Sequence, residues 1–200
     1  FIIKDYSMNL KKLIKTSKVY SKGHFMSNDG MLTSVWGPSM WHYLHTMSFN
    51  YPVKPSLKDK QQYKRFMLTL HHTLPCRHCR ENLKKNFKTL PLTDKVMSSR
   101  NSFSRYVYTL HETVNHLLGK KSGLTYCDVR ERYEHFRARC KIDTPNILTR
   151  KQVRKKKEKE KGCTEPLYGK KAKCIIKIVP QTSKTETFQL SEKCLTRRHK

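Results

Sequence analysis

The stretch SFSRYVYTLHETVNHLLG, residues 102–119, decides the fold class because it carries the clearest helical pattern in the chain. A spacing of three or four between apolar residues is typical of an amphipathic helix that buries one face. The apolar residues at this spacing are Phe103, Tyr106, Val107, Leu110, Val114, Leu117 and Leu118. Gly119 follows them as a natural C-terminal stop. The stretch therefore predicts one long helix of a helical core.

Four further helices are predicted outward from this one, over residues 35–52, 56–74, 76–90 and 127–140. In the first of these, Pro38 can occupy the first helical turn. Little of this region alternates between apolar and polar residues with the period of two that strands require. The sequence therefore predicts an all-α fold, a four-helix bundle with a short fifth helix.

The charge of the chain is extreme and unevenly spread. Its formal net charge is +28, and residues 148–200 hold 17 Lys or Arg against 5 Asp or Glu. We therefore divide the chain into a basic N-terminal arm (1–31), a helical domain (32–147) and a basic, cysteine-containing C-terminal tail (148–200). Both extensions are expected to be poorly ordered, and the tail is expected to attract nucleic acid or an acidic surface. No apolar run approaches the roughly 20 residues of a membrane span.

The stretch LPCRHCREN, residues 74–82, places two thiols three positions apart, and three interpretations compete. A structural zinc site needs four ligands, but no second CxxC supplies the other two. A thioredoxin-like dithiol follows a strand, whereas this pair follows a helical segment. The third interpretation is a redox dithiol at a helix N-terminus, where free N–H groups and the helix dipole favour thiolate. We favour this one and predict no metal.

Three other short stretches suggest what a redox dithiol could meet. In GPSMWHYLH, Trp41 and His45 lie four positions apart and hence on one helical face, and HETVN spaces His111 and Asn115 in the same way. LGK then ends that helix with Lys120. Together these groups suit a large, flat, doubly phosphorylated cofactor. Taken singly, each has a plainer role: tryptophan in the core, histidine bonded to a carbonyl, lysine on the surface.

The ordered set G-x3-W-x3-H, PCxxC, H-x2-VN-x2-LGK and an aromatic after ER resembles the Erv/ALR family of FAD-linked sulfhydryl oxidases. The resemblance covers residues 36–140. It implies a helical bundle around FAD and an enzyme that oxidises two protein thiols to a disulfide, with O2 reduced to hydrogen peroxide. It also implies a homodimer, located in the host cytoplasm or virion for a viral source and in the mitochondrial intermembrane space for a cellular one.

The resemblance also assigns roles to individual residues. It implies that Cys79 is the thiol next to the flavin and that Cys76 exchanges with the substrate. The cofactor-binding residues it implies are Gly37, Ser39, Trp41, His45, His111, Asn115, Lys120, Arg132 and Tyr133. Two of the family's positions differ here, because Tyr133 stands where the family usually has Trp and Pro38 where it usually has a basic residue.

The remaining cysteines depart from the family pattern. The family commonly joins the fourth and fifth helices by a disulfide; Cys127 stands at one of these positions, but Tyr108 occupies the other. Cys127 could pair with Cys140 or stay free. Many members carry a shuttle pair on a flexible arm, and the thiols available for that role here are Cys163, Cys174 and Cys194. An alternative hypothesis is a helical zinc- or nucleic-acid-binding module in which the CxxC is structural and the basic tail carries the function.

Overall fold

The computed structural model describes residues 21–139, 162–167, 170–180, 182–183 and 191. The helices and strands among them are α2 (Lys22–Met26), α3 (Thr33–Asn50), α4 (Leu57–Thr73), α5 (Arg77–Thr89), the 3-10 helix η1 (Val96–Ser98), α6 (Arg100–Leu117), α7 (Tyr126–Glu134), β1 (Ala138–Arg139) and β2 (Glu165–Pro166).

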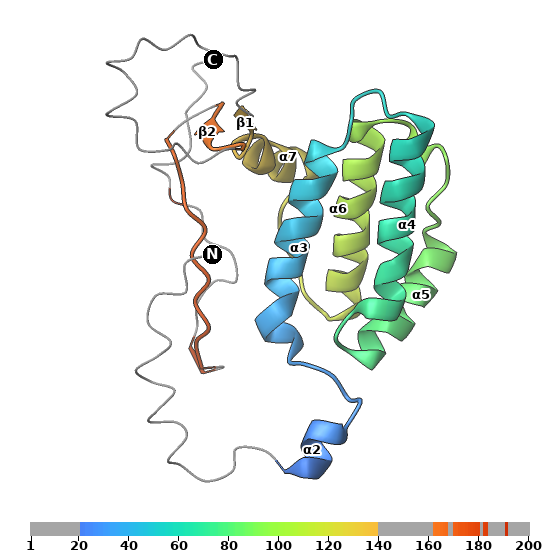
Figure 1. Ribbon diagram of the computed structural model, residues 1–200, viewed down its shortest axis with the longest axis vertical. Helices are drawn as coiled ribbons and strands as arrows, with labels where there is room; N and C mark the ends of the chain where they lie inside the picture. Colours follow the sequence, from blue (N-terminus) through green and yellow to red (C-terminus); the bar gives the residue numbers. More distant parts are fainter. Residues whose placement is uncertain (1–20, 140–161, 168–169, 181, 184–190, 192–200) are drawn as a thin grey trace, which may run out of the picture.

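The helices α3, α4, α5 and α6 form the body of the described structure (Figure 1). Helix α3 packs against α6, and α4 packs against α5. The short helix α7 closes one end of the bundle, where it contacts both α3 and α6. The predicted four-helix bundle with a short fifth helix is confirmed.

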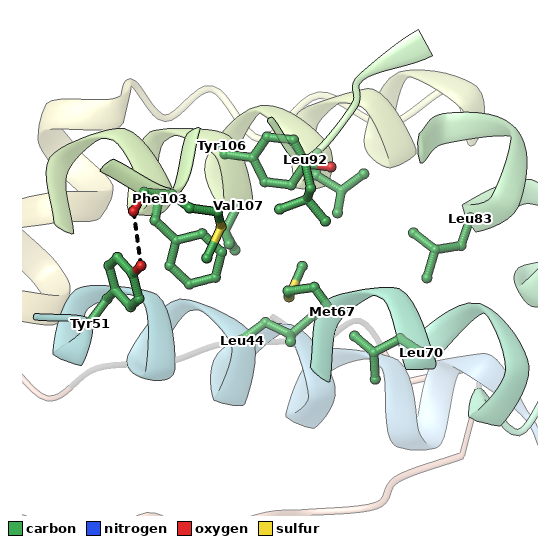
Figure 2. Packing of buried hydrophobic residues seen from close by; sticks show 11 residues of the cluster. Leu44, Tyr51, Met67, Leu70, Leu83, Leu92, Phe103, Tyr106 and Val107 are labelled. Atoms are coloured by element: carbon green, nitrogen blue, oxygen red, sulfur yellow. Dashed lines mark hydrogen bonds between the residues drawn. The ribbon is translucent and has the colours of Figure 1, made fainter. Parts of the chain in front are cut away.

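The core lies where the apolar faces of these helices meet (Figure 2). Phe103 and Val107 of α6 are fully buried, as the spacing of apolar residues predicts. Tyr51, which follows α3, is equally buried, and its hydroxyl donates a hydrogen bond to the carbonyl of Met97 at 2.9 Å. The other buried members of this cluster are Leu44, Met67, Leu70, Leu83, Leu92, Met97, Tyr106 and Leu110. This packing holds α3, α4, α5 and α6 as one body.

Side-chain caps begin several of the helices. The hydroxyl of Ser56 accepts from the N–H of Asp59, and the carboxylate of Asp59 accepts from the N–H of Ser56. This reciprocal pair satisfies two free donors at the start of α4. Ser99 and Thr125 cap α6 and α7 in the same way. Local sequence thus fixes where these helices start.

Two helix boundaries differ from those predicted. Helix α3 begins at Thr33, so that Pro38 lies inside the helix and not in its first turn. Helix α7 ends at Glu134, and Ala138–Arg139 instead pairs antiparallel with Glu165–Pro166. At the end of α7, pairing with residues distant in sequence overrides the helical pattern.

The terminal segments are described only in part. Residues 21–31 of the predicted arm include α2. Residues 1–20 and most of the predicted tail lie outside the described residues, so the prediction that they are poorly ordered stays a prediction. Among the helices that are described, none combines the length and hydrophobicity needed to cross a membrane.

Candidate active site

The two thiols of the CxxC stretch stand at the N-terminus of α5. Cys76 is the N-cap residue, and its sulfur accepts a hydrogen bond from the backbone N–H of Cys79 at 3.2 Å. The two residues form a disulfide, with their Cα atoms 5.2 Å apart. Both residues are partly buried. The positive end of the helix dipole stabilises a thiolate here when the disulfide opens.

The chain just before the disulfide is held from two sides. On one side, the guanidinium of Arg80 donates to the carbonyl of Leu74 at 2.6 Å. On the other side, the N–H of Met31 donates to the carbonyl of Pro75 at 2.7 Å, and Gly30 forms a β-bridge with Cys76. The approach of residues 27–31 to the dithiol is a feature that sequence analysis missed.

Gly30 is required by this close approach. Its φ of +121° is in the region that glycine alone adopts readily. A Cβ atom there would lie 2.7 Å from the carbonyl oxygen of Pro75 and 2.9 Å from the Cα of Cys76. A larger residue would therefore push the segment away from the dithiol.

A cluster of rings from three helices forms a second part of the site. Trp41 of α3 stacks on His111 of α6, with ring centroids 4.0 Å apart and planes within 8°. His45 Nε2 and His111 Nδ1 share a hydrogen bond of 3.0 Å. Tyr133 of α7 stacks on His45, with centroids 5.1 Å apart. The structure thus brings together four of the residues predicted to contact a cofactor.

Burial keeps the two histidines of this cluster neutral. Burial, together with the neighbouring His111 and His42, lowers the pKa of His45 from 6.5 to about 3. Burial also lowers the pKa of His111 to about 4; Glu112 opposes this effect and Lys120 adds to it. In their shared hydrogen bond, one neutral ring therefore donates and the other accepts.

His45 also carries a polar atom that its protein neighbours leave unsatisfied. Its Nδ1 is buried and has no hydrogen-bond partner among the described residues. Leaving a buried polar atom unpaired costs about 1–3 kcal/mol. Such an atom, surrounded by stacked rings, can bind a polar group on a flat ligand.

The other predicted cofactor residues lie around this cluster. Asn115 is one turn beyond His111, and its amide donates to the carboxylate of Glu112 at 2.9 Å. The backbone N–H of Lys120 donates to the carbonyl of Asn115 at 2.8 Å, which keeps this cation beside the end of α6. Arg132 precedes Tyr133 on α7 and is half-buried.

Gly37 and Ser39 are placed differently. They lie in α3 before Trp41, and Ser39 is exposed to solvent. Ser39 lines an apolar hollow of about 370 Å³ together with Pro75, the residue that precedes the disulfide. The structure therefore brings Ser39 near the dithiol side of α3 and not into the ring cluster.

A model of the Erv1/Alr family matches residues 38–137. This range includes the disulfide and all four rings of the cluster. The chain belongs to the Erv1/Alr family.

Relatives of the chain in this family come from viruses, plants and fungi. A probable FAD-linked sulfhydryl oxidase of Acanthamoeba polyphaga mimivirus is 36% identical over 99 residues, which cover 50% of this chain and 68% of the relative. An FAD-linked sulfhydryl oxidase of Arabidopsis thaliana is 34% identical over 84 residues, 42% of each chain. The crystal structure of the yeast Erv1 core is 24% identical with a TM-score of 0.47, covering 60% of this chain and 94% of that one.

Three aromatic residues of the site were missed by sequence analysis. The ring of His42 contacts the hydroxyl of Tyr133 through Nδ1 at 3.2 Å. The ring of Phe49 stacks on that of Tyr133, with the two planes within 4° of each other. The ring of Phe136 contacts the Tyr133 ring edge-on. His42 and Phe49 stand three before and four after His45, so helical spacing was the signal that could have found them.

The contact between α6 and α7 replaces the disulfide that the family commonly has there. Cys127 is a free, exposed cysteine, so it does not pair with Cys140. Tyr108 instead packs edge-on against Tyr126, and its hydroxyl donates to the carbonyl of Leu124 at 2.8 Å. Ring packing and a hydrogen bond hold the two helices together.

Among the candidate shuttle thiols, Cys163 is disulfide-bonded and Cys174 is free and exposed. Cys194 lies outside the described residues. Within the described part of the chain, no group of three or more His, Cys, Asp or Glu side chains is arranged to hold a metal ion.

Proposed function

We propose that this chain, an FAD-linked sulfhydryl oxidase of the Erv1/Alr family, forms disulfides in protein thiols through Cys76 and Cys79. The observation that carries the proposal is the disulfide between these residues at the N-terminus of α5. A partly exposed disulfide in that position is an electrophile, and its leaving thiolate gains from the helix dipole.

The reaction begins with thiol–disulfide exchange. A substrate thiolate attacks the sulfur of Cys76; a substrate–Cys76 disulfide forms, the Cys76–Cys79 bond breaks, and Cys79 leaves as a thiolate. A second substrate thiolate then attacks the substrate sulfur of that mixed disulfide and releases Cys76. Two electrons have moved from the substrate dithiol to the enzyme pair. The thiolate of Cys76 is stabilised by the N–H of Cys79, which donates to its sulfur, and by the positive end of the α5 dipole.

The ring cluster fits an FAD cofactor. Parallel aromatic planes, neutral imidazoles and the unsatisfied Nδ1 of His45 match a flat, heteroatom-rich ring system. The residues proposed to hold it are Gly37, Ser39, Trp41, His45, His111, Asn115, Lys120, Arg132 and Tyr133. Lys120 and Arg132 supply positive charge for phosphate groups. Bound FAD would accept the electron pair of the reduced dithiol and pass it to O2, which gives hydrogen peroxide.

The absorption spectrum of the purified chain tests this function. We expect the spectrum of bound FAD, and we expect oxygen uptake when dithiothreitol is added as the thiol. A colourless protein with stoichiometric zinc and no oxygen uptake would contradict the proposal and favour the alternative, a structural CxxC beside a basic binding tail.

Three broader predictions accompany this function. The apolar hollow beside Ser39, which Trp36 and Tyr43 also line, supports a homodimer in which a second copy covers it; light scattering would test the mass. The net charge of residues 148–200 supports binding of nucleic acid or an acidic surface, and salt-dependent binding lost on deletion of that tail would test it. The division at residues 31 and 147 stays a prediction.

The location of the protein also stays a prediction. The relatives include mimivirus and iridovirus oxidases and a mitochondrial yeast enzyme. They support the host cytoplasm or virion as one location and the intermembrane space as the other. Immunogold labelling of infected or uninfected cells of the source organism would distinguish the two.

A further inference from the structure

An open cavity of about 540 Å³ lies directly beside the redox disulfide. Its wall is formed by Ser27, Asn28, Gly30, Pro75, Arg77 and Arg80. Pro75 and Arg77 are the two chain neighbours of Cys76, and Gly30 is bridged to Cys76 itself. Any polypeptide whose cysteine reaches the sulfur of Cys76 therefore brings its adjacent side chains to this cavity.

The charges that line the cavity are positive. Arg80 is held in place by its 2.6 Å hydrogen bond to the carbonyl of Leu74, and Arg77 is exposed at the rim. Neither forms an ion pair with any residue that the structure describes. The acidic residues nearest in sequence, Asp29 and Glu81, do not line the cavity. A buried or half-buried guanidinium without a carboxylate partner favours an anionic ligand.

The positive surface continues from the cavity along α5. Arg77, Arg80, Lys84 and Lys88 recur at spacings of three and four, so they form a stripe along one side of the helix. Glu81 is exposed on the same side, so the stripe carries four positive charges against one negative charge. Leu83 and Asn86, which the bundle buries, face another side. At a rise of about 1.5 Å per residue, the stripe extends roughly 16 Å from the dithiol. It is long enough to follow several residues of an extended chain.

We propose that this cavity and stripe select substrates whose reactive cysteine is flanked by Asp or Glu. The inference deepens the proposed oxidase function and rests on it. The side chain next to the substrate cysteine enters the cavity and meets Arg77 and Arg80, and acidic residues further along lie against Lys84 and Lys88. The arginines bring the substrate sulfur to Cys76, and thiol–disulfide exchange follows as described above.

The test compares reduced Cys-x-x-Cys peptides by oxygen uptake with the full-length holoenzyme. Three peptides of equal length carry Glu, Gln or Lys next to the cysteines, and a fourth carries the same Glu residues six positions away. We expect kcat/KM to be at least fivefold higher for the adjacent-Glu peptide than for the Gln peptide, and lowest for the Lys peptide. The displaced-Glu peptide should fall near the Gln peptide. The ratio should shrink in about 0.5 M NaCl, because salt screens exposed charges.

Variants then locate the effect. Arg77→Gln should lower the Glu-to-Gln ratio of kcat/KM by at least half, because Arg80 keeps part of the positive charge. Lys54→Gln, which removes the same charge from the loop at the far end of α3, should keep the wild-type ratio. Binding of a Cys→Ser adjacent-Glu peptide, followed by fluorescence anisotropy, gives a readout that needs no turnover and should weaken with Arg77→Gln only.

Equal kcat/KM for the Glu and Gln peptides, with dithiothreitol still oxidised, would overturn the charge selection and leave the oxidase function intact. No oxidation of dithiothreitol or of any peptide would overturn both. Equal peptide rates together with duplex DNA binding that Arg77→Gln abolishes would assign the stripe to nucleic acid and likewise overturn the proposal. The comparison of adjacent and displaced Glu in the wild type remains decisive if a variant fails to fold.

Discussion

Lowering the pH from 7.5 to 5.0 is expected to destabilise the folded protein through two histidines of the ring cluster. Burial lowers the pKa of His45 from 6.5 to about 3 and that of His111 from 6.5 to about 4. At pH 5.0 both rings are therefore neutral in the folded state and protonated in the unfolded state. Since the unfolded state binds more protons, the free energy of unfolding falls as the pH falls below 6.5.

The size of the loss in unfolding free energy follows from the difference between pH 5.0 and the unfolded pKa of 6.5. Each pH unit below 6.5 costs about 1.4 kcal/mol per histidine while the folded ring stays neutral. Over 1.5 units, His45 and His111 each contribute a loss of about 2 kcal/mol, or roughly 4 kcal/mol together. A domain of ordinary stability has only about 5–15 kcal/mol in total. Above pH 6.5 the two histidines cost no stability, because they are neutral in both states. Below pH 6.5 the free energy of unfolding decreases progressively, until the pH reaches the folded pKa values of about 4 and 3.

Urea unfolding at the two pH values and constant ionic strength measures this loss. His45→Gln removes one titrating ring and should reduce the pH-dependent loss by about 2 kcal/mol, whatever its effect at pH 7.5. His116→Gln, on the exposed side of α6, is the control and should retain the wild-type loss. A wild-type loss of less than about 1 kcal/mol between the two pH values, or a loss in His45→Gln as large as in the control, would show that His45 is not buried as a neutral ring.

Three further outcomes follow from the same structure. Cys79→Ser should keep bound FAD but abolish bleaching of the flavin absorption by dithiothreitol, and normal turnover would refute its role. His111→Ala removes the stacking on Trp41 and the hydrogen bond to His45, so FAD should dissociate at least tenfold more readily in equilibrium dialysis; unchanged affinity would exclude that contact. Phe103→Ala, at a fully buried position, should lower the free energy of unfolding by about 3–5 kcal/mol in urea titration, and a loss below 1 kcal/mol would contradict its place in the core.

Local sequence predicts the helices well where their signals are local. The apolar spacing around Phe103 and Val107 predicts α6, and the Ser56–Asp59 pair predicts the start of α4. The predicted start of α3 was wrong because the first turns of this helix depend on contacts outside it. The indole N–H of Trp36 donates to the carbonyl of Met31 at 3.1 Å, which no spacing rule reveals. Pro38 lies inside α3, beyond its first turn.

The predicted end of α7 was also wrong, and the reason is again contacts made outside the helix. The apolar pattern of residues 127–140 continues past Glu134, but Arg137 donates to the carbonyl of Phe49 at 2.9 Å and to the carboxylate of Glu134. Leu167 then donates to the carbonyl of Arg137 at 2.7 Å, in line with the pairing of the two short strands. Phe49 and Leu167 are far from Arg137 in sequence, so a pattern read along residues 127–140 does not reveal these contacts.

The dithiol can be predicted from the sequence more fully than the ring cluster can. The dithiol is a local structure: Cys76 caps the helix that contains Cys79, and the four residues that define it are contiguous. The ring cluster joins His45, His111 and Tyr133 from three helices, and only the family resemblance linked them before the fold was known. Packing of α7 against α3 can therefore change while the geometry of the disulfide stays fixed. It follows that a change at Phe49, which stacks on Tyr133 and packs among residues of α6 and α7, should loosen the cofactor site and leave the reactivity of Cys76 toward thiols unaltered.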